Sequence, residues 1–330
     1  MVRLLDGTFD AVFPMFQQTT ESFGPWTRLR VFDDATPLSL TILPAYGGAL
    51  TELVLQKDGT AFSVLDGVCD PSELAEGQPE RYKNSWLVPF ANRVKDGQYH
   101  FGAHTYQLPI NEPERHHALH GLVYRRAFEV VSVQTHDEEA VVRLEARHPG
   151  DPDGYPFAFR VEILYRLHAA EGFSATLRVT NESNHAAPLV AGWHPYFRLS
   201  SSVDELQLQL PACKRVRLNE WLVPGGRVES FATFAAPTAL AEHDLNHCLA
   251  LEAHEGTVET RLVGREATLV VWQEAGPGKF NYLQVFTHPT RTTVALEPMS
   301  GAVDAFNNGM GLIMLVPDEQ FEAQAGVKLR

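Results

Sequence analysis

The sequence has few cysteines, and none of them are close together. Its 330 residues include only Cys69, Cys213 and Cys248. An odd number of distant cysteines provides neither a disulfide framework nor a cysteine-based zinc site, and it fits a reducing compartment. We therefore expect a cytoplasmic protein.

Long apolar runs are also absent. No stretch approaches the roughly 18 apolar residues that a membrane span requires. The N-terminal segment MVRLLDGTFD lacks the apolar core and the small-residue cleavage site of a signal peptide. We therefore expect neither a membrane anchor nor a signal peptide.

Basic residues are scarce relative to acidic ones. Lys and Arg together number 27 and Asp and Glu 41, which gives a formal net charge of -14. A surface with this charge repels polyanions, so the composition argues against nucleic acid and anionic membranes as partners. A neutral ligand is indifferent to this field.

Helical patterns are rare, and the dominant period is two. Apolar and polar residues alternate over 142–147, 161–167, 173–180 and 206–210. Such segments have one apolar and one wet face, as antiparallel strands packed on a second sheet do. The exception is 71–77, where an early Pro71 and a stop at Gly77 favour a short helix.

Glycine and proline mark turns throughout the chain. The 24 glycines and 21 prolines are spread out rather than gathered in one linker. With 44% hydrophobic residues, the chain has ample material for a large core. We predict an all-β fold, a single domain over residues 1–330 built as a large antiparallel β-sandwich with few short helices.

One histidine lies in an unusual setting, the segment AGWHPYFRL at residues 191–199. Gly192 leaves room for a close backbone approach, and Pro195 fixes the chain just after His194. An imidazole in this aromatic frame can move a proton near neutral pH, or it can be a packed core residue. The segment alone leaves both interpretations open.

Two polar residues interrupt C-terminal strand patterns. Gln284 lies in LQVFT, and Glu297 lies between Leu296 and Pro298. A carboxylate in such a place usually needs a partner or a function. A satisfied buried glutamate is the alternative.

Further binding candidates lie in two other segments. Asn92 and Arg93 precede a turn, and Arg93 is either a surface cation paired with an acid or a fixed donor to a polar ligand. In an extended segment Asp244 and Asn246 point to the same face. They are either a polar strand start or a pair of hydroxyl-binding side chains.

Three histidines are close together in ERHHALHG, residues 114–121. His116, His117 and His120 have no carboxylate or cysteine at a standard ligand interval, so we expect no metal site. Gly121 suggests a tight turn that exposes the imidazole of His120.

Taken in order, these motifs resemble the aldose 1-epimerase (mutarotase) family, and the resemblance spans nearly the whole chain. It implies a large antiparallel β-sandwich with an open cleft, no cofactor and no required metal. The motifs that carry it are Asn92-Arg93, Leu119-His120-Gly121, Gly154-Tyr155-Pro156, the GWHPYF segment at 192–197, Leu283-Gln284 and Leu296-Glu297-Pro298.

The resemblance also implies roles for single residues. Glu297 is expected to be the base at the C1 hydroxyl of a sugar, and His194 the acid at the ring oxygen. The implied resting form is a Glu297 carboxylate with a His194 imidazolium, which predicts a bell-shaped pH profile. His120 is expected near the ring oxygen, and Arg93 and Gln284 at sugar hydroxyls.

The sequence departs from the family pattern near position 246. Asn246 stands where an aspartate that binds sugar hydroxyls is usual, and Asp244 lies two positions earlier. Asn246 keeps a hydrogen-bond acceptor but loses the charge. The Trp193-His194 dipeptide also differs from the Asn-His dipeptide common among galactose mutarotases, which suggests a divergent subgroup acting on another sugar. By residue type, Trp193, Tyr196 or Phe197 could form an apolar wall for the sugar.

The sequence therefore predicts a cofactor-independent isomerase that acts on a free aldohexose, as a monomer or homodimer. One alternative is a hexose-6-phosphate 1-epimerase, with Arg125 and Arg126 as phosphate-binding candidates. Another is a mutarotase-like module that binds sugar without turnover.

Overall fold

The computed structural model describes residues 16–75, 82–252 and 255–330. Antiparallel strands account for 52% of the structure and helices for 4%, which confirms the all-β prediction. The four alternating segments form β12 (Glu139–His148), β13 (Phe159–His168), β14 (Gly172–Asn181) and β18 (Gln207–Gln209). In the described ranges no helix is long and apolar enough to cross a membrane.

Helices are short, as predicted. The expected one is α1 (Ser72–Ala75), and α2 (Ala305–Asn308) is the second. Two 3₁₀ turns, η2 (Lys95–Gly97) and η3 (Val203–Glu205), are the other helical elements among the described residues. The predicted stop at Gly77 and the segment considered for a signal peptide lie outside the described residues.

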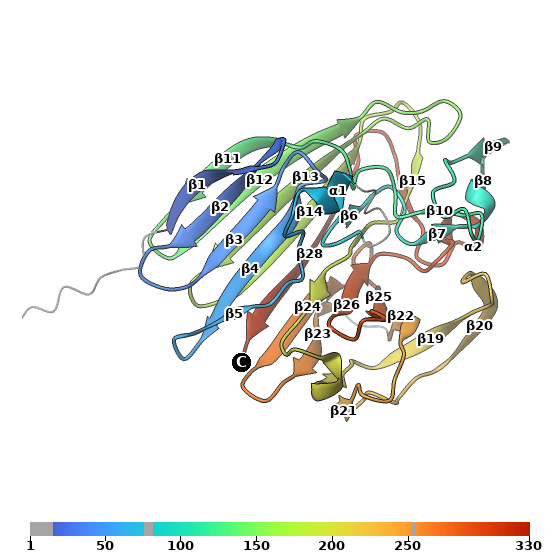
Figure 1. Cartoon of the computed structure of the whole chain (residues 1–330). Helices are drawn as coiled ribbons and strands as arrows, with labels where there is room; N and C mark the ends of the chain where they lie inside the picture. The colour runs from blue at the N-terminus through green and yellow to red at the C-terminus, as the bar shows by residue number, and fades with distance from the viewer. Residues whose placement is uncertain (1–15, 76–81, 253–254) are drawn as a thin grey trace, which may run out of the picture.

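Two large sheets form the sandwich (Figure 1). A five-stranded sheet follows chain order: β1 (Phe16–Phe23), β2 (Trp26–Asp33), β3 (Ser39–Leu43), β4 (Ala49–Lys57) and β5 (Thr60–Ser63). A nine-stranded sheet has the order β11 (Glu129–Thr135), β12, β13, β14, β28 (Gln320–Leu329), β24 (Thr268–Ala275), β23 (Gly256–Val263), β18 and β21 (Thr238–Ala239).

Apolar side chains from both sheets meet in one core. Ile42 of β3 and Ile163 of β13 belong to the same buried cluster. Gly48 allows the close approach of the layers, because a Cβ there would lie 3.1 Å from Leu144 Cδ1 and 3.3 Å from Ile163 Cδ1. The period-two alternation thus buries one face of each strand between the layers.

A third, eight-stranded sheet carries most of the functional candidates. Its order is β20 (Pro224–Ser230), β19 (Cys213–Leu218), β22 (Asn246–Leu251), β25 (Tyr282–Thr287), β26 (Val294–Met299), β16 (Gly192–Trp193) and β6 (Trp86–Leu87), and β17 (Tyr196–Phe197) also pairs with β26.

Three short strand pairs are the remaining sheets of the described residues, and their labelled strands lie at the upper right of Figure 1. They are β7 (Arg93–Val94) with β10 (Ala118–Leu119), β8 (Gln98–Phe101) with β9 (His104–Gln107), and β15 (Ala187–Leu189) with β27 (Ile313–Leu315). The first pair brings Arg93 opposite Leu119, next to His120.

Candidate active site

A polar pocket lies between the eight-stranded sheet and the β7–β10 pair. Its volume is about 150 Å³, below the roughly 300–1,000 Å³ of pockets for drug-sized ligands, so it suits one small polar molecule. It is lined by Tyr82, Asn92, Arg93, Glu112, Leu119, His120, His194, Tyr196, Asn246, Gln284, Phe286 and Glu297.

Strand register explains why distant polar residues meet in this pocket. Gln284 of β25 pairs with Glu297 of β26, and Asn246 of β22 pairs with Phe286 of β25. Directly opposed residues share a sheet face, and so do residues two apart on one strand. The four side chains therefore project from the same face of the sheet.

His194 occupies the short connection between β16 and β17, and both of these strands pair with β26. Gly192 is opposite Met299, and Tyr196 is opposite Ala295. This places the imidazole beside Glu297, with 3.4 Å between His194 Nε2 and Glu297 Oε1. The GWHPYF segment thus serves to hold one histidine against one buried glutamate.

Burial opposes charge on both partners. It lowers the pKa of His194 to about 3, and it raises the pKa of Glu297 well above its ordinary value. The Arg93 charge acts in the opposite direction on Glu297 but is the smaller influence. The protein as described therefore favours a neutral carboxyl beside a neutral imidazole, in contrast to the carboxylate–imidazolium pair that the family resemblance implies.

Four buried polar atoms of the pocket have no protein partner among the described residues. They are His120 Nδ1, His194 Nδ1, Gln284 Oε1 and Glu297 Oε2. A buried polar group left unpaired costs about 1–3 kcal/mol. Such a cost concentrated at one pocket is typical of a site that binds a ligand with several hydrogen-bonding groups.

The Arg93 guanidinium is fixed on the pocket wall. Its Nε donates to Glu112 Oε2 at 2.8 Å and its Nη2 to Glu112 Oε1 at 2.7 Å, while Nη1 donates to Asn92 Oδ1 at 3.2 Å. Although burial acts to raise it, hydrogen bonds and charge from Arg93 and Arg115 hold the pKa of Glu112 below its ordinary value. Arg93 is thus both paired with an acid and held as a donor.

His120 lies in the bend that Gly121 predicts and itself has a φ of +62°. A Cβ at Gly121 would lie 2.3 Å from the Val88 carbonyl oxygen, at a φ of +77°. The turn buries the imidazole in the pocket wall instead of exposing it. Burial, then His194 and Arg93, lower the pKa of His120, so its ring is neutral beside His194 at a centroid distance of 4.9 Å.

Asn246 lines the pocket and Asp244 does not. Gln284 Nε2 donates to Asn246 Oδ1 at 2.7 Å. The Asp244 side chain is 98% exposed and pairs with Arg291 at 3.0 Å. The prediction that Asp244 shares the site is therefore wrong, because β22 begins only at Asn246 and strand alternation does not extend back to position 244.

The aromatic candidates divide in the same way. Tyr196 lines the pocket together with Phe286. Trp193 and Phe197 are fully buried in the core, where Trp193 stacks on Trp86 at 5.7 Å between ring centroids. Of the three candidates for an apolar wall, only Tyr196 is placed to contact a ligand.

Four lining residues were missed by the sequence reasoning, and one of them, Leu119 of β10, was noted only as part of a family motif. Phe286 lies two positions after Gln284 on the same strand face, so strand alternation could have identified it. Tyr82 and Glu112 lie outside the regular strands, where no period indicates direction. Glu112 reaches the site because its carboxylate pairs with Arg93.

The other two histidines of the 114–121 segment have structural contacts. His117 Nδ1 accepts from the Asp96 backbone N–H at 3.2 Å, so its Nε2 carries the proton and donates to the Trp221 carbonyl at 3.0 Å. His116 is exposed, with Asp96 3.6 Å away. Within the described ranges no group of three or more His, Cys, Asp or Glu side chains could hold a metal ion.

The two phosphate-binding candidates lie elsewhere. Arg125 stacks over the ring of Tyr124, and Arg126 donates to the Arg147 carbonyl at 2.9 Å. Neither of them lines the pocket. Among the described lining residues the arginine is Arg93.

Known proteins resemble this chain in sequence. The family model for aldose 1-epimerase matches residues 34–328. The uncharacterised Escherichia coli K12 protein YihR is 31% identical over 254 residues, which cover 73% of this chain and 77% of that protein. Galactose mutarotase from Mus musculus is 25% identical over 225 residues, which cover 66% of this chain and 60% of that protein.

Solved structures share the fold. A galactose mutarotase-like protein from Clostridium acetobutylicum superimposes with a TM-score of 0.83 at 19% identity, over 96% of this chain and 99% of that one. Galactose 1-epimerase from Lactobacillus acidophilus gives 0.78 at 18% identity, over 96% and 98%. With a match to the family model across nearly its whole length, this chain belongs to the aldose 1-epimerase family.

Proposed function

We propose that the protein interconverts the α and β anomers of a free aldose without a cofactor. The observation that carries the proposal is the buried contact between His194 and Glu297, at one end of a pocket of monosaccharide size. Pure binding needs no such acid–base pair, so the geometry favours catalysis over a sugar-binding module.

Anomerisation requires two proton transfers that are reversed in each turnover. The C1 hydroxyl loses a proton, the ring oxygen gains one, and the ring opens to an aldehyde. C1 then rotates, and the same steps in reverse close the ring on the other face. In the proposal Glu297 accepts the hydroxyl proton and His194 donates to the ring oxygen, so both groups are restored at the end.

The neutral form of the pair is compatible with these roles. A Glu297 carboxyl and a neutral imidazole hold one proton between them, as do a carboxylate and an imidazolium. Transfer of that proton across the 3.4 Å contact converts one form to the other. The two groups therefore titrate as a pair, and their apparent pKa values belong to both.

The remaining lining residues supply hydrogen bonds and an apolar surface. In the proposal Arg93, His120 and Gln284 contact sugar oxygens, with Asn92 and Asn246 beside them. These groups offer both donors and acceptors, which suits hydroxyls because each can donate and accept. Tyr196 and Phe286 provide the surface for the C–H face of the ring.

An uncharged sugar fits better than a sugar phosphate. The arginine on the pocket wall, Arg93, already forms two hydrogen bonds to the Glu112 carboxylate. Arg125 and Arg126 do not line the pocket. A phosphate there would face a paired cation and a nearby carboxylate, which does not favour its binding.

The test is anomer exchange of several free aldoses and their 6-phosphates, measured by NMR magnetisation transfer. We expect exchange on at least one free aldose and its loss in Glu297→Gln, with folding verified by circular dichroism. Full activity of a folded Glu297→Gln variant would overturn the proposed mechanism. Exchange on 6-phosphates alone would reassign the substrate, and binding without exchange would support a sensor.

A further inference from the structure

Asn84 is a fully buried residue outside the pocket whose side chain joins three chain segments. Its Nδ2 donates to the carbonyl oxygens of Leu50 at 3.0 Å and Asp66 at 3.2 Å. Its Oδ1 accepts from the Tyr196 backbone N–H at 3.0 Å. Asn84 is 0% exposed, and its bonds to Leu50 and Tyr196 are buried while its bond to Asp66 is partly buried.

The backbone around Asn84 holds His194 directly. The Asn84 N–H donates to the His194 carbonyl at 2.9 Å, and the His194 N–H donates to the Ser85 carbonyl at 2.9 Å. Trp193 Nε1 donates to the Asn84 carbonyl at 3.3 Å. Two consecutive residues therefore bind both backbone polar groups of the candidate acid.

The rest of the His194–Tyr196 segment is held as well. The Pro195 carbonyl accepts from the N–H of Leu296, the neighbour of Glu297, at 3.3 Å, and the Tyr196 carbonyl accepts from the Asp66 N–H at 2.9 Å. Each backbone hydrogen-bonding group from 194 to 196 thus has a partner. The segment is anchored on one side to the strand of Glu297 and on the other to Asn84 and Asp66.

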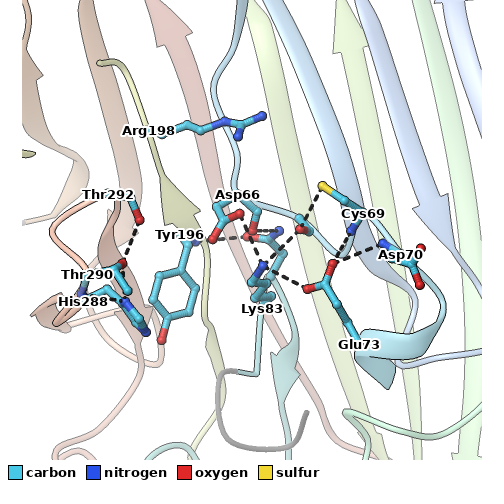
Figure 2. Close-up of polar contacts among 12 residues, drawn as sticks. Asp66, Cys69, Asp70, Glu73, Lys83, Tyr196, Arg198, His288, Thr290 and Thr292 are labelled. Atoms are coloured by element: carbon cyan, nitrogen blue, oxygen red, sulfur yellow. Dashed lines mark hydrogen bonds and ion pairs between the residues drawn. The ribbon is translucent and has the colours of Figure 1, made fainter. Parts of the chain in front are cut away.

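Lys83 secures the Asp66 side of this arrangement. Figure 2 shows its ammonium between two carboxylates, with Nζ 3.3 Å from Asp66 Oδ1 and 3.3 Å from Glu73 Oε2, and with Tyr196 beside Asp66. A third contact joins Nζ to the Gly67 carbonyl at 3.3 Å. The Asp66 segment, whose N–H binds the Tyr196 carbonyl, is therefore itself held in place by Lys83.

We propose that Asn84 is a positioning residue for His194, which holds the imidazole in register with Glu297. This rests on the proposed function, in which those two groups exchange protons with the sugar. The site requires two donors towards carbonyls and one acceptor towards an N–H, a combination that a side-chain amide provides. The backbone at Asn84 has a φ of +56°, a region where asparagine is enriched among non-glycine residues.

Asn84→Gly removes the side chain while keeping a backbone that tolerates this φ. We expect kcat to fall by about tenfold to 10²-fold, since small misplacements of reacting groups have effects of this size. KM should stay near the wild-type value, because the hydrogen bonds of Asn84 in the described structure go to Leu50, Asp66, Trp193, His194 and Tyr196 and not to Arg93, Gln284 or Asn246. The pH profile should shift, because the contact that couples His194 to Glu297 loosens.

Asn181 provides a matched control. It is also buried, and its Nδ2 donates to the carbonyls of His185 and Leu315, each at 2.8 Å, while its Oδ1 accepts from the Ser183 N–H at 2.9 Å. It does not line the pocket. We expect Asn181→Ala to lower Tm to a similar extent as Asn84→Gly but to keep the wild-type kcat and pH profile.

A measurement without turnover separates this inference from the proposed function. The His194 imidazole resonance, assigned by its loss in His194→Gln, should shift in Asn84→Gly and stay in place in Asn181→Ala. If the wild type shows no exchange on any aldose, the proposed function fails while this shift still tests the positioning role.

Conservative replacement gives the second variant. Asn84→Asp, whose buried carboxyl we expect to be protonated, keeps the acceptor for Tyr196, one donor towards the carbonyls and the tolerance of positive φ. We therefore expect a kcat between those of the wild type and Asn84→Gly, and this variant replaces the glycine variant if that one does not fold. A folded Asn84 variant with wild-type kcat and an unshifted imidazole would overturn the inference. So would an equal loss of kcat in Asn181→Ala.

Discussion

His194 Nε2 lies 3.4 Å from Glu297 Oε1, and the two side chains are only 6% and 2% exposed. The other polar side-chain atoms of the pair, His194 Nδ1 and Glu297 Oε2, have no protein hydrogen-bond partner among the described residues. A fold optimised for stability alone would satisfy or replace such groups. The pair therefore combines a stability cost with a geometry suited to proton transfer.

The first prediction concerns stability and activity in Glu297→Gln. The pKa of Glu297 in the folded protein is raised well above 4.5. The contribution of this carboxyl to stability is therefore fully present below pH 4.5 and is lost as the pH rises towards the folded pKa. Glutamine does not titrate. We expect Tm of the variant minus Tm of the wild type to increase with pH above 4.5, while exchange falls by about 10²–10⁴-fold.

Thermal unfolding of both proteins across this pH range provides the measurement. A Tm difference that shrinks as pH rises would mean that Glu297 is ionised in the folded protein. Exchange rates on the same samples connect the stability gain to the loss of the base.

The second prediction is an acid limb far below that of an ordinary histidine. Burial lowers the pKa of His194 to about 3, so the second proton joins the pair only near that pH. Because the pKa of Glu297 is raised, the single remaining proton is lost well above pH 4.5. We expect kcat/KM, which reports the free enzyme, to stay high between these limits.

The profile is measured by exchange kinetics, with circular dichroism to identify the pH at which the protein unfolds. A limb centred near 6.5 that disappears in His194→Gln would show that His194 titrates normally despite its burial.

The third prediction tests the support of Arg93. Hydrogen bonds to charged groups contribute about 1.5–3 kcal/mol, and Glu112 accepts two of them from Arg93. We expect Glu112→Gln to raise KM for a free aldose by about tenfold to 10²-fold. The rate on a 6-phosphate relative to its free hexose should rise, because the charge of Arg93 is no longer neutralised.

Arg115→Gln is the control for this variant. Arg115 pairs with the same carboxylate at 3.1 Å, but its side chain is 35% exposed and does not line the pocket. Partly exposed pairs contribute about 0–1 kcal/mol, so KM should change little. If both substitutions raised KM equally, the effect of Glu112→Gln would come from the general change of charge and not from the loss of hydrogen bonds to Arg93.

Strand alternation was a sound guide to the elements but not to their order. The period of two located β12, β13 and β14 because each buries one face against the other layer. That β28 lies between β14 and β24 could not be read from local pattern, since it depends on contacts between distant segments. The ordered family motifs supplied what alternation could not.

The same distinction applies to the pocket. Glu297 and Gln284 stood out because polar residues interrupt strands, and register brings them together. The prediction for Asp244 was wrong because strand alternation was extended to residues that precede Asn246, the first residue of β22. Asn84 gave no signal at all, because its role consists of backbone contacts to segments distant in sequence.

The fourth prediction concerns specificity at Asn246. Its Oδ1 accepts from Gln284 Nε2, which leaves Nδ2 as a donor. Asn246→Asp keeps the acceptor for Gln284 and exchanges the donor for a second acceptor. A sugar oxygen facing this position must then donate instead of accept, so the order of preference among aldoses should change.

We expect kcat/KM to change by about two- to tenfold for at least one aldose, the range for gain or loss of one hydrogen bond. Asp244→Asn is the matched control, since it alters the same pair of functional groups at a side chain that is 98% exposed. A panel of epimeric aldoses, compared by exchange rate, provides the measurement. If Asp244→Asn reorders the panel and Asn246→Asp does not, the assignment of Asn246 to the pocket wall must be reversed, because only a side chain that contacts the sugar can distinguish its epimers.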